Sequence, residues 1–200
     1  MRITASIMIA CFALFLLQIF YEPFTGLAAL TPAMAVNGMY WQFFTYMFLH
    51  GSISHLAINM IGLFIFGAVV EKLIGVRRYL FLYIASGLGA GAFHILLTGI
   101  SDVPMLGASG AVFAVLTAYA VKFPKNWIIV FPGIPVPAAL LVVFFAFFEF
   151  FSGMLGFEPG IANFGHLGGI LFGFIFMFYW EKISKNKHEP ESFQWVWETW

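Results

Sequence analysis

The stretch VPAALLVVFFAFFEFF, residues 136–151, decides the class of fold. Its one ionisable residue is Glu149, and its apolar residues run together instead of alternating with polar ones, as they would in a transmembrane β-strand. The rest of the chain has the same character, since 62% of its 200 residues are hydrophobic and 9% are charged. A soluble domain has about 45–50% apolar residues. The sequence therefore predicts an all-α protein whose helices lie in a lipid bilayer.

Six apolar runs divide the chain, and we expect each to cross the membrane as one helix. At about 20 residues a span, six spans take about 120 residues and leave short connections, which suits one polytopic domain over residues 1–181. A basic and aromatic tail, residues 182–200, follows it. The first run is longer than the roughly 7–15 apolar residues of a signal peptide, so we expect it in the mature protein. The runs, numbered as spans one to six, are 4–20, 53–70, 79–97, 107–121, 136–151 and 161–180.

The positive charges indicate which way the spans run. All nine Lys and Arg residues fall on one side of the membrane, and the connections on the other side, 21–52, 98–106 and 152–160, hold none. Because cytoplasmic loops are enriched in Lys and Arg, both termini are expected in the cytoplasm, and spans two, four and six run inward from the outside. The formal net charge of zero argues against a nucleic-acid-binding protein. The nine residues are Arg2, Lys72, Arg77, Arg78, Lys122, Lys125, Lys182, Lys185 and Lys187.

Two connections on the outer side carry further predictions. The first, residues 21–52, is far longer than an ordinary loop, so we expect it to have structure of its own. Its segment 40–44, YWQFF, suits the membrane interface. Span four has about 15 residues against about 20 needed to cross the hydrocarbon core. Its outer end should therefore lie below the membrane surface, reached by irregular backbone over residues 101–105.

Nearly all the polar residues of the spans lie in one layer near the outer side. Polar and ionisable side chains are unfavourable in a bilayer and mark functional sites. At a rise of about 1.5 Å per residue, those near the outer ends of spans two, four and six fall within roughly 10 Å of one another in depth. They are His55, Asn59, Ser109, Asn163 and His166.

Small residues would allow spans four and six to approach closely. If their small-residue stripes meet, Ser109 and His166 come within the roughly 2.6–3.2 Å that a serine activated by a histidine requires. His55 and Asn59 are four residues apart, so they share a helix face and are candidate donors to an oxyanion. The stripes are Gly165, Gly169 and Gly173 on span six and Ala111, Ala114 and Ala118 on span four.

Other interpretations of these residues are possible. An ion or proton pathway would continue the polarity toward the cytoplasm, but spans two and six turn apolar below Asn59 and His166. Glu149 is interpreted as a structural residue that snorkels or bonds across helices, although it could tune a gate. No metal is expected, because a zinc site built from histidines lacks HExxH spacing and Cys11 is the single cysteine. The histidines considered are His50, His55, His94 and His166.

Three motifs, taken in order, resemble the rhomboid intramembrane serine proteases. They are HGSISHLAIN at 50–59, GASG at 107–110 and GHLGG at 165–169. The resemblance covers about residues 37–181 and implies a six-span core of the bacterial type, in the inner membrane, with an active site that opens to the outer side. The spacing of four further residues also follows that family: Gly67, Glu71, Gly75 and Tyr79.

The resemblance also implies a role for each candidate residue. Ser109 is then the nucleophile and His166 its general base, a dyad without the aspartate of the serine-protease triad. His55 and Asn59 help to stabilise the oxyanion, together with the backbone amide of Ser109. Span five and the loop after it form a mobile gate, and the connection 21–52 is embedded in the membrane. The supporting residues are His50, Gly107, Gly110, Phe113 and Asn163.

By the same resemblance, the substrates are transmembrane segments of membrane proteins, cut near their outer ends without a cofactor. The alternative is a rhomboid-like protein that binds membrane clients without cutting them, and the oligomeric state stays open. The chain also departs from the family pattern, with Phe113 where relatives often have tyrosine and Gln42 where they often have arginine. Phe113 keeps the stacking face and lacks the hydroxyl.

Overall fold

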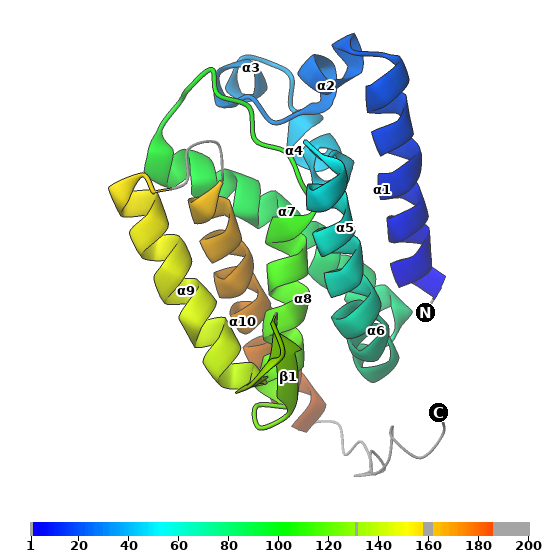
Figure 1. Cartoon of the computed structure of the whole chain (residues 1–200), viewed down its shortest axis with the longest axis vertical. Helices are drawn as coiled ribbons and strands as arrows, with labels where there is room; N and C mark the ends of the chain where they lie inside the picture. The colour runs from blue at the N-terminus through cyan, green and yellow to red at the C-terminus, as the bar shows by residue number, and fades with distance from the viewer. Residues whose placement is uncertain (1, 131, 158–161, 186–200) are drawn as a thin grey trace.

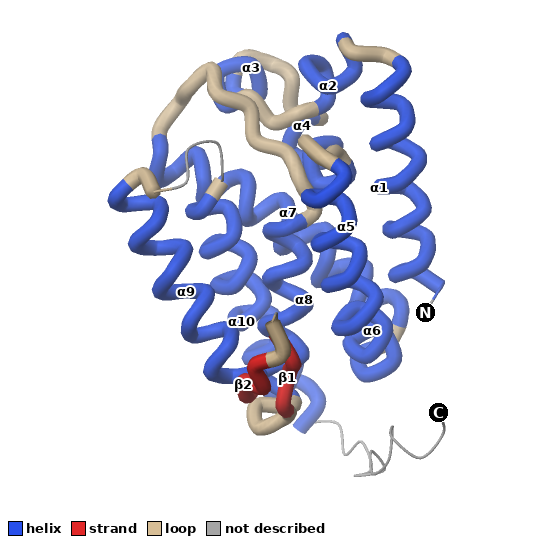
Figure 2. Tube along the Cα trace, viewed as in Figure 1, coloured by secondary structure: helices blue, strands red, loops and turns tan. Residues whose placement is uncertain are grey.

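The computed structural model describes residues 2–130, 132–157 and 162–185, and this part of the chain is mostly helical (Figures 1 and 2). Most of the tail predicted at 182–200 lies outside the described residues. The elements in chain order are α1 (Arg2–Phe20), α2 (Pro23–Ala28), α3 (Pro32–Val36), α4 (Gln42–Thr45), the 3-10 helix η1 (Tyr46–Phe48), α5 (Ile53–Gly62), the π-helix η2 (Leu63–Gly67), α6 (Ala68–Ile74), α7 (Val76–Thr98), α8 (Ser109–Lys122), β1 (Trp127–Val130), β2 (Ile134–Pro137), α9 (Ala138–Leu155) and α10 (Asn163–Lys185).

Five helical stretches are long and apolar enough to cross a membrane: α1, the continuous run from α5 to α6, α7, α9 and α10. The other apolar helix, α8, has 14 residues, so the short helix predicted there is confirmed. Large apolar side chains face outward on the long helices, among them Phe12, Ile58 and Phe147, each more than half exposed. Since a water-soluble monomer rarely exposes so much apolar surface, the bundle is a membrane-embedded one.

The connection after α8 differs from the prediction, because it contains a two-stranded antiparallel sheet (Figure 2). β1 and β2 pair in a register that places Trp127 opposite Pro137. The sequence pattern predicts that span five begins at Val136, whereas α9 begins at Ala138. Pro135 and Pro137 have no N–H for a helix, and each disfavours a helical conformation at the residue before it. The all-α class is thus right for the bundle and wrong for this connection.

The outer connection, residues 21–52, is structured as predicted, with α2, α3, α4 and η1 lying over one end of the bundle (Figure 1). Gln42 is fully buried within it. The Oε1 atom of Gln42 accepts from the N–H of Thr31 at 3.0 Å, and its Nε2 donates to the carbonyl of Leu27 at 3.3 Å. Trp41 donates its Nε1–H to the same carbonyl at 3.0 Å. The neutral amide at position 42 therefore ties α4 both to α2 and to the chain between α2 and α3.

The chain reaches α8 through irregular backbone, as predicted for residues 101–105. Leu30 and Met105 exchange two backbone hydrogen bonds of 2.9 Å, and the N–H of Gly107 donates to the carbonyl of Tyr46 at 3.0 Å. Irregular backbone is tolerated at membrane depth only where protein or water satisfies it. Here the outer connection supplies hydrogen-bond partners to the descending chain.

α8 is largely buried and contacts α5, α7, α9 and α10. A Cβ atom at Gly173 of α10 would lie 2.6 Å from the carbonyl oxygen of Ala114, and one at Gly169 would collide with the backbone of Gly110. The predicted glycine stripe is thus a helix contact, although its partners on α8 are Gly110 and Ala114. Because the two backbones are in contact, the distance and orientation between the first turns of α8 and α10 are fixed.

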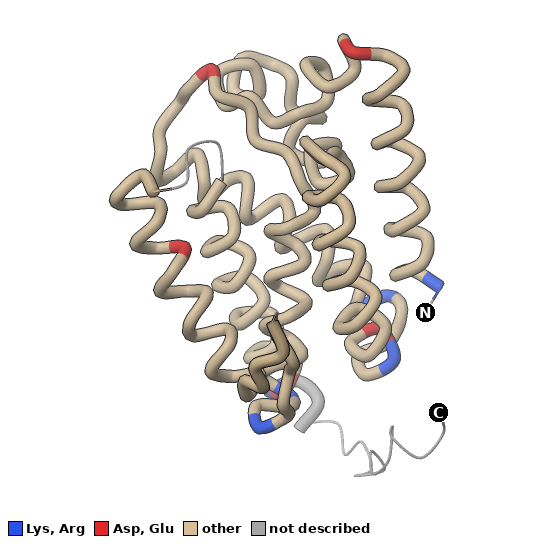
Figure 3. Tube along the Cα trace, viewed as in Figure 1, with Lys and Arg blue, Asp and Glu red and all other residues tan. Residues whose placement is uncertain are grey.

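Charge distinguishes the two ends of the bundle (Figure 3). In the described chain, Lys and Arg gather at the end that holds α6 and the β1–β2 sheet, and the outer connection at the opposite end has none. The one-sided distribution of Lys and Arg predicted from the sequence is therefore present in the described part of the structure.

Candidate active site

Ser109 is the first residue of α8, and Gly107 shapes the backbone that leads to it. Gly107 has a φ of +136°, a conformation that residues with a side chain rarely adopt. A Cβ atom at this position would also lie 2.8 Å from the ring of His55. The GASG motif therefore needs glycine at 107 both for its conformation and for the close approach of His55.

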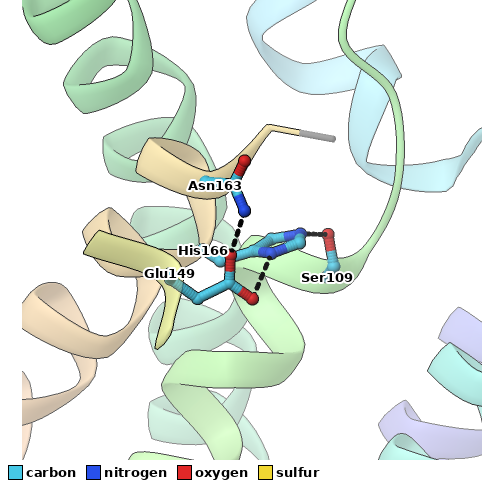
Figure 4. A network of polar contacts seen from close by, with 4 residues as sticks. All are labelled: Ser109, Glu149, Asn163 and His166. Atoms are coloured by element: carbon cyan, nitrogen blue, oxygen red, sulfur yellow. Dashed lines mark hydrogen bonds and ion pairs between the residues drawn. The ribbon is translucent and has the colours of Figure 1, made fainter. Parts of the chain in front are cut away.

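The hydroxyl of Ser109 meets the imidazole of His166 (Figure 4). His166 lies in the first turn of α10, and its Nε2 atom is 2.7 Å from the Oγ atom of Ser109. This distance suits transfer of the serine proton to the histidine. For Nε2 to accept that proton, the hydrogen of the neutral ring must sit on Nδ1. The structure thus brings together the two residues predicted as nucleophile and base.

Glu149 of α9 lies beside the other ring nitrogen (Figure 4). Its Oε1 atom is 3.0 Å from Nδ1 of His166, which is an ion-pair distance, although the oxygen is poorly aligned for a hydrogen bond. Its Oε2 atom accepts a hydrogen bond of 2.8 Å from Nδ2 of Asn163.

Sequence reasoning missed this arrangement. Glu149 was expected to snorkel or to bond across helices; snorkelling is wrong, because the side chain is buried, and the cross-helix bond has Asn163 as its partner. A signal was present in the sequence, because residue 149 falls near the outer end of span five, at the depth of the polar layer.

Phe113 packs against the same imidazole. The ring centroids of Phe113 and His166 are 4.9 Å apart, with the planes inclined at 37°. Phe113 also meets Phe145 of α9 edge-on at 5.2 Å. The contact expected of an aromatic residue at position 113 is therefore present, and the imidazole is surrounded by Ser109, Phe113 and Glu149.

His55 and Asn59 lie on α5 and line the same cavity as Ser109 and His166. Asn59 is buried and donates one Nδ2–H to the carbonyl of His55 at 2.9 Å, which leaves its second N–H for another acceptor. Among the described residues, neither side chain hydrogen-bonds to Ser109. The structure therefore places both predicted oxyanion donors at the cavity and not in direct contact with the nucleophile.

His50 supports His55 from outside the spans. Its ring lies edge-on to that of His55 at a centroid distance of 5.1 Å, and its backbone N–H donates to Oε1 of Gln18 at 2.9 Å. Burial, with a smaller contribution from the nearby His55, lowers the pKa of the His50 imidazole to about 4. The His50 ring is therefore neutral at pH 7.

A cavity of about 1110 Å³ lies over the site. Its polar lining includes Ser109, His166, Glu149, His55 and Asn59, and its remaining walls are mostly apolar side chains of α5, η2, α8, α9, β1 and the chain that leads to α8. A few converging polar groups in an apolar cavity are typical of a binding or active site. Apolar residues that line it include Ile58, Ile61, Ile65, Ile128, Ile129, Leu141, Phe145 and Phe148.

A family model and several known proteins are similar in sequence to this chain. A family model described as Rhomboid domain matches residues 37–182. RHOMBOID-like protein 5 of Arabidopsis thaliana is 32% identical over 152 residues, which cover 76% of this chain and 48% of that protein. Rhomboid protease GluP of Bacillus subtilis is 29% identical over 153 residues, which cover 76% of this chain and 28% of that protein.

An inactive protein is also among the relatives. Inactive RHOMBOID-like protein 8 of Arabidopsis thaliana is 30% identical over 139 residues, which cover 70% of this chain and 38% of that protein. The chain spans about half the length, or less, of these three relatives. Because similarity does not separate proteases from inactive relatives, the residues of the site must decide the activity.

Proposed function

Because the chain belongs to the rhomboid family, we propose that it is an intramembrane serine endopeptidase that cleaves transmembrane segments of other membrane proteins. The observation that carries the proposal is the 2.7 Å distance between Oγ of Ser109 and Nε2 of His166. A serine and a histidine in this geometry suit nucleophilic attack on a peptide carbonyl. This chemistry requires no cofactor.

The reaction proceeds in two halves. Oγ of Ser109 bonds to the scissile carbonyl carbon while its proton passes to Nε2 of His166. When the tetrahedral intermediate collapses, the C–N bond breaks and Nε2 returns the proton to the leaving amine, so that the acyl group is esterified to Ser109. Water then attacks the ester, and His166 again accepts and returns a proton. The products are two peptides, and the enzyme is restored.

Donors for the oxyanion come from two helices in this proposal. His55 and the free N–H of Asn59 come from α5, and the backbone amide of Ser109 comes from α8. The first N–H groups of a helix have no partner within it and carry partial positive charge. His55 and Asn59 line the same cavity as Ser109, so a substrate carbonyl bound there lies among these donors in the proposal.

Transmembrane substrates suit the walls of the cavity. Apart from the polar residues near Ser109, the faces of α5 and α9 that line it are apolar, as an entering transmembrane segment is. Such a segment must unwind locally before a peptide bond is exposed, so we expect small or helix-destabilising residues near the scissile bond. Ser109 follows directly on the backbone tied to the outer connection, so the cut falls near the outer end of the substrate.

The proposal includes six spans with both termini in the cytoplasm. α8 serves as the fourth span, because the outer connection covers the backbone above it. The Lys and Arg at the opposite end of the described bundle support a cytoplasmic position for that end (Figure 3). The site then opens to the outer side of the membrane. A bacterial inner membrane is proposed because GluP of Bacillus subtilis, one of the relatives, is a bacterial protein.

The experiment is a cleavage assay in proteoliposomes, with a membrane protein whose transmembrane segment has small residues near its outer end. The wild-type protein should release a soluble fragment, and Ser109→Ala and His166→Ala should each abolish release. Ser6→Ala is the matched control and should cleave like the wild type, because its hydroxyl donates to the carbonyl of Arg2 on an exposed part of α1. Unchanged cleavage by Ser109→Ala contradicts the proposal, and folded wild-type protein that cuts nothing favours a rhomboid-like client binder.

A further inference from the structure

We propose that Glu149 is a positioning residue for His166, so that the site works as a Ser–His–Glu triad whose third member is carried by α9. The inference deepens the proposed function and rests on it. It starts from the contact in Figure 4, where the two carboxylate oxygens of Glu149 are shared between His166 and Asn163.

Burial of Glu149 is the first argument. The side chain is almost completely buried, between Phe148 and Phe150 in the sequence of a helix that has no other charged residue. A carboxylate in such surroundings is strongly unfavourable unless it is hydrogen-bonded and lies beside a positive charge. A snorkelling carboxylate would extend to the membrane surface, whereas this one points into the bundle (Figure 4). Its location therefore has a reason other than solvation.

The proton on His166 supplies that reason. Nε2 must be the unprotonated nitrogen if it is to accept the proton of Ser109, so the ring hydrogen must be on Nδ1. A carboxylate oxygen 3.0 Å from Nδ1 favours this tautomer and stabilises the imidazolium that forms when Ser109 gives up its proton. A carboxylate performs these two tasks in the serine-protease triad.

Asn163 holds the carboxylate in place. It donates to Oε2 of Glu149 at 2.8 Å and lies three residues before His166, on the same face of α10. One turn of α10 therefore contacts both oxygens of Glu149, which restricts rotation of the carboxylate group. The polar residue at 163, which the sequence marked as supporting, acquires a definite function as a second positioning residue.

The helix that carries Glu149 also walls the cavity. Leu141, Phe145 and Phe148 of α9 line it together with Glu149. The contact between Glu149 and His166 has the distance of an ion pair and poor alignment, and catalytic hydrogen bonds often tighten only in the substrate complex. A displacement of α9 changes the shape of the cavity and the position of the carboxylate together.

The first test measures kcat and KM separately in the proteoliposome assay. Glu149→Gln keeps the shape of the side chain and removes its charge, so kcat should fall by about 10- to 100-fold, below the full contribution of a general base. KM should stay within about twofold, because glutamine keeps the shape of the side chain that lines the cavity. Glu149→Asp should recover part of kcat. Ser152→Ala, in the next turn of α9, is the control and should behave like the wild type, because its hydroxyl has no hydrogen-bond partner among the described residues.

The second test needs no turnover, so it separates this inference from the proposed function. The 15N NMR spectrum of histidine-labelled protein, with the His166 signals assigned by comparison with His166→Ala, should show the hydrogen on Nδ1 in the wild type. In Glu149→Leu the population should shift toward the Nε2–H tautomer. A wild-type ring with the hydrogen on Nε2 overturns the inference. It is also overturned if the tautomer is unchanged in Glu149→Leu and kcat is unchanged in Glu149→Gln, even if Ser109 proves to be the nucleophile. If no protein cleaves, the proposed function fails, and the tautomer still decides the positioning role.

Discussion

The two sides of the site are built in opposite ways. On one side, α8 and α10 meet through glycine and alanine, and their backbones are so close that a Cβ at Gly169 or Gly173 has no room. On the other side, α5 and α9 face each other across a cavity of about 1110 Å³ lined by large apolar side chains. The first side fixes the distance between Ser109 and His166, and the second leaves space for a substrate. One helix pair therefore holds the catalytic residues at a fixed distance, and the other borders the space that a substrate can enter.

Glu149 belongs to both sides, since it sits on α9 and contacts His166 of α10. If this division holds, a substitution of an apolar residue should act on catalysis at the α8–α10 contact and on substrate access at the α5 and α9 walls, whereas the polar residues Asn59 and Glu149 of those walls should act on catalysis. Four predictions test this division, in order of decreasing expected effect.

Asn59→Ala should have the largest of the four effects, although Asn59 lies on α5. If Asn59 donates to the oxyanion, kcat falls by about 10²–10³-fold while the protein remains folded. Asn37→Ala is the matched control, because Asn37 makes the same kind of bond to the carbonyl four residues earlier, at 2.8 Å, on the exposed surface at the end of α3. Loss of folded protein in Asn59→Ala, measured by size-exclusion chromatography, would reassign Asn59 to helix packing.

Gly169→Ala should come next, because one methyl group separates the two close backbones. The displacement of His166 from Ser109 should lower kcat by on the order of 10²-fold, the effect of a misplacement of about 1 Å, and it should lower Tm. Gly26→Ala, a position with open space around it, should change neither quantity. An active, fully stable Gly169→Ala would show that the α8–α10 contact is not the rigid side.

Acidification tests how much the neutral ring of His50, which packs against His55 of α5, contributes to the stability of the fold. The folded pKa of His50 is about 4, below the roughly 6.5 of an exposed histidine, so the unfolded chain binds the extra proton between these values. The stability that neutral His50 contributes is fully present above about pH 6.5 and is lost as the pH falls toward 4. Tm in detergent should decline over this window, and it should decline less in His50→Phe. If Tm declines equally with pH in the wild type and in His50→Phe, the buried neutral His50 is not the cause of the pH dependence.

Phe148→Ala should have the smallest effect on the fold. The side chain is partly exposed and lines the cavity on α9, so its loss should change the free energy of unfolding by about 0.5 kcal/mol or less. The effect should appear in KM for transmembrane substrates and not in kcat, as measured by initial rates at several substrate densities in the membrane. A large fall in kcat with KM unchanged would place Phe148 with the rigid side.

Much of this arrangement could be predicted from the sequence, because a bilayer leaves few places for polar residues. The shared depth of Ser109 and His166, together with the glycine stripe, predicts their contact on the condition that spans four and six meet along their small residues. The motifs around them also indicate the family. The motifs and the glycine stripe are local signals, since each lies within one helix or one connection, and the shared depth follows from the position of each residue in its own span.

The remainder depends on contacts between helices, which a local pattern does not encode. Nothing in the run around Glu149 states which face of α9 turns toward α10, so the sequence favours a structural role for this carboxylate. The apolar residues of β1 and β2 are compatible with a span, and Pro132, Gly133, Pro135 and Pro137 oppose it. Gln42 departs from the family pattern, and its buried bonds across the outer connection follow only from the packing of α2 to α4.

The most direct test of the central claim, that His166 activates Ser109, is labelling of the detergent-solubilised protein with a fluorophosphonate probe, read by mass spectrometry. We predict one adduct on Ser109 in the wild type, none in Ser109→Ala and a greatly reduced rate in His166→Ala. Labelling that persists in Ser109→Ala, that proceeds unchanged without His166, or that is absent from folded wild-type protein would contradict the claim.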